Sequence, residues 1–185
     1  MTIFSVANQF TNYECYRADS EEYLYVLIYN LVSYYCQLRF NDYLPSMKII
    51  FIYTDRFGYR IGEESGADEE QIRNEVVYED VQTAFIHVES KDQEAENSNR
   101  LVTKFIKQAK WVARKNNSNH IILHSFAHLA DTKSEPEFAK DIFDSCQERL
   151  ENAGFTVNQT PFGHFLDLDL KAPGRSLARV YYEIN

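Results

Sequence analysis

The pattern of apolar and polar residues divides the chain near Met47. Over about 20–39, apolar residues recur at the three- and four-residue spacing of an amphipathic helix, which ends before Pro45. We therefore predict an N-terminal extension, 1–46, with one helix. This helix is either a docking element for a partner or membrane surface, or packed on its own domain, or part of an extension from an upstream start codon. The extension contains no lysine, which disfavours an anionic membrane surface.

From Met47 onward, short apolar runs alternate with two longer segments of helical periodicity. The helical segments are 98–115 and a segment that ends at Ala153. The second helix is predicted to begin with a capping box at 134–137 and to end at a left-handed Gly154. Strands are predicted at 48–53, 57–61, 81–89, 120–124, 155–157, 165–170 and 177–184, with a turn at 54–55 and a polar loop or short acidic helix at 62–74.

The order of these elements indicates the fold class. Strands outnumber helices, and neighbouring strands can pair as hairpins. The prediction is an α+β domain over 47–185, with a mixed β-sheet that carries two main helices.

Composition narrows the function classes. The net charge is −9, whereas a protein that wraps nucleic acid is normally basic, so any nucleic-acid partner must bind at a local site. The only basic cluster lies on the 98–115 helix, either as a stripe that contacts phosphates or as an ordinary solvated face. No apolar run suits a transmembrane helix, and no secretory signal is present, so we expect a cytoplasmic protein without a membrane partner. Cys146, one of three scattered cysteines, is expected to be a packed, inert thiol.

All five histidines lie after Met47, at 87, 120, 124, 128 and 164. Several stand at predicted strand ends, where α/β proteins usually build sites. One interpretation is a metal site formed by His124, His128 and either His87 or His164. The other is that each histidine is hydrogen-bonded locally. The spacing is a weak signal, and we expect neither a metal nor a cofactor.

Five short motifs resemble those of one known family. They are MKIIFIYTD at 47–55, AFIHVE at 84–89, SFAHL at 125–129, TPFG at 160–163 and GRSLARV at 174–180. In this order and spacing they resemble the archaeal-type editing domain of threonyl-tRNA synthetase. The resemblance implies a fold like that of D-aminoacyl-tRNA deacylases, and a proofreading hydrolase that removes serine from mischarged threonine tRNA. It also implies a freestanding homodimer that acts in trans on the charged tRNA 3′ end, with a threonyl-tRNA synthetase that lacks an editing domain as a partner.

The resemblance also implies a set of site residues. In the family, main-chain groups hold the aminoacyl adenosine, and this role falls here to Val88, Glu89 and Ala127. Phe126 and His128 would line the pocket. The family's mechanism uses the 2′-OH of the terminal ribose to help place a water, with a tyrosine and a lysine nearby. An activated ester needs an aimed water and donors for the developing oxyanion more than it needs a protein nucleophile.

This chain departs from the family at that tyrosine and lysine. Phe165 and Leu166 stand at their positions, and Arg175 and Arg179 replace a histidine and a glutamate of the closing motif. We predict as catalytic residues His128, His164 and Arg175. We predict as substrate contacts Val88, Glu89, Phe126, Ala127, Phe165, Leu166 and Arg179. Two alternatives stay open. The loss of the lysine motivates a non-catalytic module that binds an aminoacyl-tRNA or nucleotide, and a deacylase of D-aminoacyl-tRNA is the other.

Overall fold

The computed structural model describes residues 47–62, 74–93 and 98–184, which belong to the compact unit Pro45–Asn185. The predicted helix over 20–39, and all but the ends of the predicted polar loop over 62–74, lie outside the described residues. The described elements are, in chain order, β1 (Lys48–Ile61), β2 (Val76–His87), the 3-10 helix η2 (Ser90–Gln93), α4 (Ser98–Lys115), β3 (His120–Ser125), α5 (Pro136–Asn152), β4 (Thr156–Gln159), β5 (Leu166–Lys171) and β6 (Arg179–Glu183).

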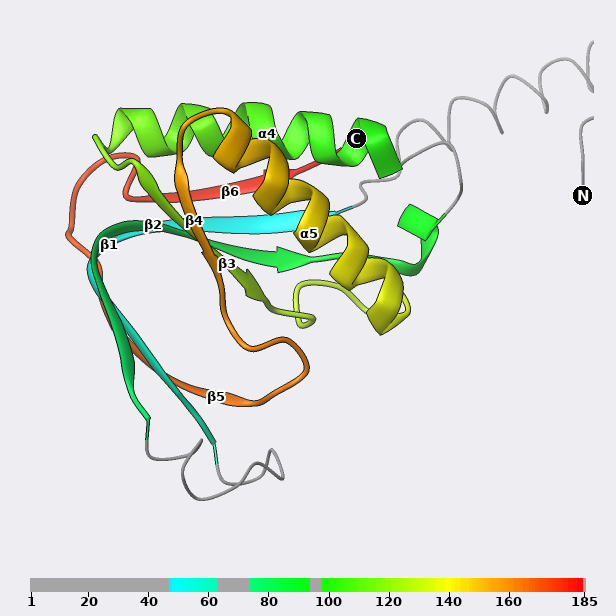
Figure 1. The fold of residues 1–185 in the computed structure, drawn as a ribbon, viewed down its shortest axis with the longest axis horizontal. Helices are drawn as coiled ribbons and strands as arrows, with labels where there is room; N and C mark the ends of the chain where they lie inside the picture. The colour runs from blue at the N-terminus through cyan, green and yellow to red at the C-terminus, as the bar shows by residue number, and fades with distance from the viewer. Residues whose placement is uncertain (1–46, 63–73, 94–97, 185) are drawn as a thin grey trace, which may run out of the picture. The chain divides into compact units, whose positions relative to one another are not determined.

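The strands form one six-stranded sheet, in which β4-β3-β2-β1-β5 follow one another and β6 also pairs with β1. β1 is antiparallel to β2 on one side, and on its other side it pairs antiparallel with β6 along its first half and with β5 along its second half. The β2–β3 and β3–β4 pairs are parallel. Helices α4 and α5 both lie over one face of this sheet (Figure 1). The predicted α+β class, with a mixed sheet and two main helices, is therefore confirmed.

The helices and one face of the sheet enclose the larger hydrophobic core. The prediction of α4 is correct at both ends, because its apolar spacing places Leu101, Phe105 and Val112 on one buried stripe. Phe105 stacks on Phe51 of β1, with ring centroids 6.0 Å apart. Neither of the described α-helices is long and apolar enough to cross a membrane.

The second helix, α5, differs from its prediction at its beginning. Glu135 is the N-cap residue and makes no side-chain capping bond, so the predicted capping box is wrong. Ser134 is instead buried, and its main-chain N–H donates to the carbonyl of Val88, 3.0 Å away. At the other end, Gly154 has a φ of +87°, as the predicted left-handed cap requires.

A sharp bend, rather than the predicted turn, lies at 54–55. β1 continues through it as one strand of 14 residues, so the prediction of two strands is wrong. Asp55 lies opposite Asp80 of β2, between regular pairs on either side, and Asp80 has a left-handed φ of +54°. Before the bend, even-numbered residues of β1 face away from the helices, and after it odd-numbered residues do. The bend therefore reverses the two faces of the strand.

The face of the sheet that is turned away from the helices carries a second hydrophobic cluster. Its buried members are Phe57, Tyr59, Val81, Phe85 and Ile122. Beyond the bend, β1 and β2 curl away from the helices together with β5 (Figure 1). Phe126, in the loop after β3, and Leu166, at the start of β5, both pack on this cluster. Two of the sequence motifs therefore meet on one face.

Candidate functional site

The loop after β3 carries the SFAHL motif on the outer face of the sheet. Its entry is fixed by main-chain bonds, because Phe126 N–H donates to the carbonyl of Ile86 over 2.9 Å, and His128 N–H donates to the carbonyl of Phe126 over 2.8 Å. The Phe126 ring packs edge-on against Phe85, with centroids 5.7 Å apart, and against His128 at 5.3 Å. Ala127 and His128 are exposed. The loop thus rests on Phe126 and presents the next two residues to solvent.

His87 holds the same loop from beneath. Its side chain is fully buried, Nδ1 accepts a hydrogen bond from Leu129 N–H over 2.9 Å, and Nε2 lies 2.7 Å from the carbonyl oxygen of Thr132. With its proton on Nε2, the ring accepts from Leu129 and donates to Thr132 at the same time. Sequence reasoning assigned His87 only to a strand or a metal site. The available signal was its place in AFIHVE, where the family segment has serine.

Val88 and Glu89 are buried where β2 ends, and their main-chain groups are already bonded. Val88 accepts from Ser134, and Glu89 N–H donates to the carboxylate of Asp92 over 2.8 Å. The Glu89 side chain forms an ion pair with Lys48 and accepts from the Thr132 hydroxyl at 3.1 Å. Burial raises the pKa of the Glu89 carboxyl, but Lys48 outweighs it, so the pKa lies below its ordinary value. These residues brace the loop, and their role as substrate contacts stays a prediction.

The TPFG motif lies beside the SFAHL loop through His124. The Nδ1 atom of His124 lies 2.9 Å from the hydroxyl of Thr160, whose N–H donates to the carbonyl of Leu123. The His124 ring packs edge-on against Phe85 at 4.9 Å. Burial lowers the pKa of His124 to about 4, so the imidazole is neutral at pH 7. Its surroundings are those of a structural side chain, as the second interpretation of the histidines expected.

The segment after TPFG carries Phe165 and Leu166, the two residues that replace the family's tyrosine and lysine. His164 and Phe165 are exposed, the latter by 68%, and the Phe165 carbonyl accepts from Gly62 N–H over 2.8 Å. Leu166 is half-buried on the cluster that also supports Phe126. Phe126 and Leu166 thus belong to one apolar surface. The two loops beside it carry His128 and His164. Their catalytic roles stay predictions.

Arg175 and Arg179 lie beside the first half of β1, the former in the segment before β6 and the latter at the start of β6. The Arg175 guanidinium stacks over the Tyr53 ring, 4.4 Å from its centroid, and Tyr53 pairs with Gln82 on the helix side of the sheet. Arg179 is opposite Ile52, and its Nη2 atom is 3.4 Å from the carbonyl of Ala172. The structure therefore does not bring Arg175 to the SFAHL loop, and its predicted catalytic role has no support from this geometry.

The remaining candidates for chemistry are accounted for by packing. Within the described residues, no three His, Cys, Asp or Glu side chains lie together in the way a metal site needs. Cys146 is buried in α5, and burial raises the pKa of its thiol to about 12. It is therefore a packed thiol, as predicted.

Comparison with known proteins identifies the family of this chain. Residues 47–184 match a model of the family described as the archaea-specific editing domain of threonyl-tRNA synthetase. The class of protein is therefore that of aminoacyl-tRNA deacylases, which hydrolyse the ester between an amino acid and tRNA. This chain belongs to the archaea-specific editing domain family of threonyl-tRNA synthetase.

Relatives with similar sequences agree with this assignment. The chain is 28% identical over 137 residues to a threonine–tRNA ligase of Thermococcus onnurineus and 27% identical to that of Pyrococcus horikoshii. In both cases the match covers 72% of this chain but only 22% of the ligase, so the chain spans about a fifth of these relatives' length.

Among solved structures, the c-Myc DNA Unwinding Element Binding Protein matches with a TM-score of 0.50 and 15% identity, over 75% of this chain and 97% of that one. This likeness shows a shared fold. A probable eukaryotic D-amino acid tRNA deacylase matches with a TM-score of 0.49 and 10% identity, over 75% of this chain and all of the other.

Proposed function

We propose that this protein edits threonine tRNA by hydrolysing the ester that links it to serine. The observation that supports this most is that the SFAHL loop and the start of β5 pack on one hydrophobic cluster, while Thr160 of TPFG contacts His124 beside that loop. SFAHL and TPFG are two of the five motifs that resemble the editing-domain family whose model matches residues 47–184. The substrate is then the charged 3′ end of the tRNA. A cytoplasmic location, expected from the sequence, and a homodimer, implied by the family resemblance, are further parts of the proposal.

The proposed chemistry relies on positioning. A synthetase gains only about 1–3 kcal/mol by recognising the extra methyl group of threonine, so a second, hydrolytic pocket has a purpose. In this pocket His128, exposed on the SFAHL loop, contacts the aminoacyl group, and the terminal 2′-OH helps to place the water. Because Leu166 offers no donor where the family has lysine, exposed His164 is our candidate for the missing polar group. Arg179 remains a candidate for the tRNA phosphates.

A deacylation assay tests the proposal. The purified 185-residue chain is mixed with threonine tRNA charged with radiolabelled serine, and release of the label is followed. We expect hydrolysis of the seryl ester, sparing of the threonyl ester and of a D-aminoacyl control, and loss of activity on tRNA that ends in 2′-deoxyadenosine. Faster hydrolysis of the D-aminoacyl ester would replace the proposal with a D-aminoacyl-tRNA deacylase. Inactivation by a chelator, with recovery on adding zinc, would instead establish a metal site.

One observation favours a second candidate, a binding module without hydrolysis. Phe165 and Leu166 make the β5 side of the site apolar and without a side-chain donor. A preorganised donor to the oxyanion is typically worth about 2.7–4 kcal/mol, so Leu166→Lys should raise the rate on seryl-tRNA. Leu166→Met, which keeps the apolar wall, is the matched control. If neither variant nor the wild type hydrolyses any charged tRNA while binding is retained, the binding module is the better assignment.

A further inference from the structure

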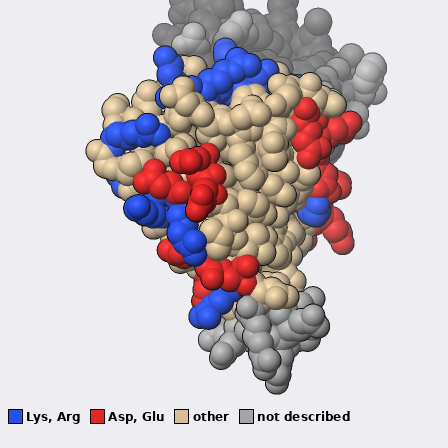
Figure 2. Space-filling view, turned by 60° about the vertical axis from the view of Figure 1, so that its left-hand side comes forward, with Lys and Arg blue, Asp and Glu red and all other residues tan. Residues whose placement is uncertain are grey.

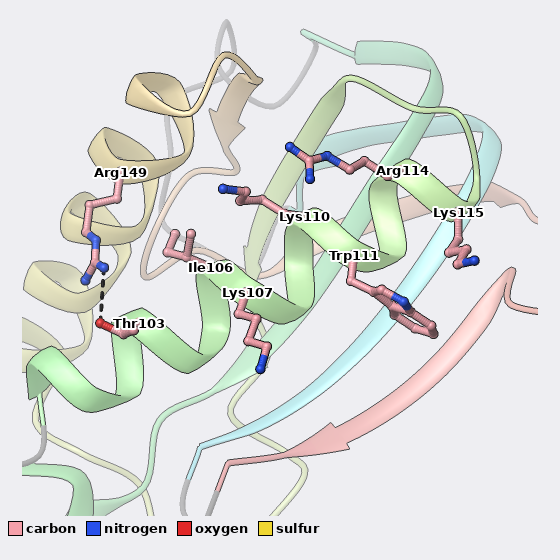
Figure 3. A pocket seen from close by; sticks show the side chains of 8 residues that line it. All are labelled: Thr103, Ile106, Lys107, Lys110, Trp111, Arg114, Lys115 and Arg149. Carbon is pink, nitrogen blue, oxygen red and sulfur yellow. Dashed lines mark hydrogen bonds between the residues drawn. The ribbon is translucent and has the colours of Figure 1, made fainter.

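The exposed face of α4 forms a surface that the editing site does not use. Together with Arg149 of α5 it lines an open groove of about 580 Å³ (Figure 3). The charged side chains of the groove are all cationic, namely Lys107, Lys110, Arg114, Lys115 and Arg149. Trp111 stands among them with 42% of its surface exposed. The positive charge and the indole therefore share one face.

This arrangement contrasts with the rest of the described surface. The whole chain has a net charge of −9, and several cations outside the groove are paired, as Arg56 is with Asp169, Arg60 with Asp167 and Lys140 with Asp144. On the face shown in Figure 2, patches of both signs border a broad uncharged area. By contrast, no cation of the groove has a carboxylate of the described residues within ion-pairing distance, which is 4.0 Å.

The groove is held in shape by its own contacts. Arg149 Nη2 donates to the hydroxyl of Thr103 over 3.1 Å, which ties α5 to α4 at one end (Figure 3). At the other end, the Arg114 guanidinium lies 5.9 Å from the centroid of the Phe155 ring. Like charges four residues apart, such as Lys110 and Arg114, destabilise a helix. This pair therefore has a cost to folding, although Arg114 and Lys115 are favourably placed in the last turn of α4. An anionic ligand would offset that cost.

We propose that this groove binds the sugar–phosphate backbone of the tRNA substrate, away from its charged 3′ end. Lysine ammonium groups and the planar guanidinium of Arg114 suit phosphate oxygens. Lys107 and Lys115 lie two turns apart, about 12 Å along the helix axis, so more than one phosphate can be contacted. Trp111 can stack on an unpaired base or a sugar. A second copy of this chain is a poor occupant, because two like-charged faces would meet. The identity of the RNA rests on the proposed editing function.

The first test measures the affinity of the full chain for uncharged, fluorescently labelled threonine tRNA at several salt concentrations. The double variant Lys107→Gln/Lys115→Gln should bind about tenfold more weakly in low salt, and the slope of log affinity against log salt should become less negative by about 1.5. The control Lys140→Gln/Lys171→Gln removes the same charge outside the groove and should change affinity less than twofold. Trp111→Ala should weaken binding without changing the slope.

Equal losses of affinity in the groove and control variants would overturn the proposal, since the effect would then come from net charge alone. Unchanged RNA affinity with a lower midpoint of thermal unfolding would also overturn it, because the groove would then be covered by protein.

The second test separates this inference from the editing function. Hydrolysis is compared on full-length seryl-tRNA and on a short seryl fragment that contains only the 3′ end. The groove variant should lower kcat/KM on the full-length tRNA about tenfold and leave the short fragment unaffected. If the wild type hydrolyses neither substrate, the editing proposal fails, while a loss of RNA affinity in the groove variant would still support the groove. Equal loss on both substrates would overturn the groove, because the substitutions would then act on the reaction site.

Discussion

At the residue scale, His87 shows how a buried side chain can define a site that it does not enter. Both of its ring nitrogens are bonded to the main chain of the SFAHL loop and of the residues just after it. Without the ring, the Leu129 N–H and the Thr132 carbonyl would lose these partners, and each lost hydrogen bond typically costs about 0.5–1.5 kcal/mol. The imidazole therefore acts by positioning the loop.

The first prediction follows from this role of His87. His87→Phe keeps the apolar bulk and removes both bonds, so the free energy of unfolding should fall by about 1–3 kcal/mol. His87→Gln is the matched control, because its amide offers one donor and one acceptor and should recover part of the loss. Urea unfolding gives the stabilities. If the loop positions the substrate, kcat on seryl-tRNA falls with His87→Phe and recovers with the glutamine. A phenylalanine variant as stable as the wild type would contradict this.

The second prediction concerns pH and His124. Burial lowers its pKa from 6.5 to about 4 in the folded protein. Between pH 6.5 and 4, His124 binds a proton in the unfolded chain but not in the folded protein. Its contribution to the free energy of unfolding is therefore present above pH 6.5 and is lost as the pH falls to about 4. The total loss is on the order of 3 kcal/mol.

A matched variant isolates this contribution of His124. His124→Gln cannot titrate and keeps a hydrogen bond within reach of Thr160. The difference in the free energy of unfolding between the wild type and this variant should shrink as the pH falls from 6.5 to 4. A difference that is independent of pH would show that His124 titrates normally.

At the element scale, the bend at Asp55 and Asp80 decides where the site forms. It turns β1 and β2 away from the helices, and β5 with them, so that Leu166 packs on the same cluster as Phe126 (Figure 1). Asp80 has a left-handed φ of +54°, and its carboxylate accepts a hydrogen bond from the Tyr53 hydroxyl over 2.9 Å. A residue in this conformation needs either no side chain or a short polar one.

The third prediction orders three substitutions at Asp80. Asp80→Asn should cost least, below about 1 kcal/mol, because asparagine tolerates a left-handed φ and keeps an acceptor for Tyr53. Asp80→Gly loses only the hydrogen bond, at about 1 kcal/mol. Asp80→Ala keeps the Cβ that aspartate already has but loses every polar contact that stabilises the left-handed φ, so it should cost most, about 1–2 kcal/mol. Thermal and urea unfolding measure the order. Alanine as stable as asparagine would mean that the bend is not strained.

The elements also show what the sequence can and cannot predict. α4 was predicted correctly because a long amphipathic period carries its own signal. β1 was divided in two because polar Thr54 and Asp55 interrupt an apolar run, and only pairing with a distant strand shows that the chain continues. Likewise β2 begins at Val76, five residues before the predicted start at 81, because acidic Glu79 and Asp80 interrupt its apolar pattern.

For the candidate site, the motifs predicted which loops form it, but not which side chains lie on the same face of the sheet. The SFAHL loop and Leu166 were placed together by resemblance, and the structure does join them on one cluster. Arg175 was grouped with them from its motif, yet it stacks on Tyr53 on the helix side of the sheet. The face on which a residue lies depends on strand register and on the bend, and neither is local in sequence.

At the scale of the whole molecule, the helix layer and the outer face have different charges and different tasks. The groove on α4 gathers cations that have no carboxylate partner among the described residues, in a protein that is acidic as a whole. The proposed editing site, on the other face, is bordered by histidines and aromatic rings, and its nearby carboxylate Glu89 forms an ion pair with Lys48. This separation suits a substrate that is polyanionic along its body and carries a small amino acid at its end.

It also follows that salt should weaken tRNA binding more than it slows hydrolysis of a short fragment.

The last prediction concerns the division of the chain at Met47. The Met47 side chain is fully buried, and its carbonyl accepts a hydrogen bond from Ile184 N–H over 3.1 Å, so the two ends of the matched segment close on each other. A chain that begins at Met47 should therefore unfold in one cooperative transition. A second chain that begins at Pro45 is the control, since it moves the charged amino terminus away from the buried methionine. Circular dichroism during heating measures both. If both truncated chains aggregate or show no transition, residues 1–46 are an integral part of the fold, and the predicted boundary is wrong.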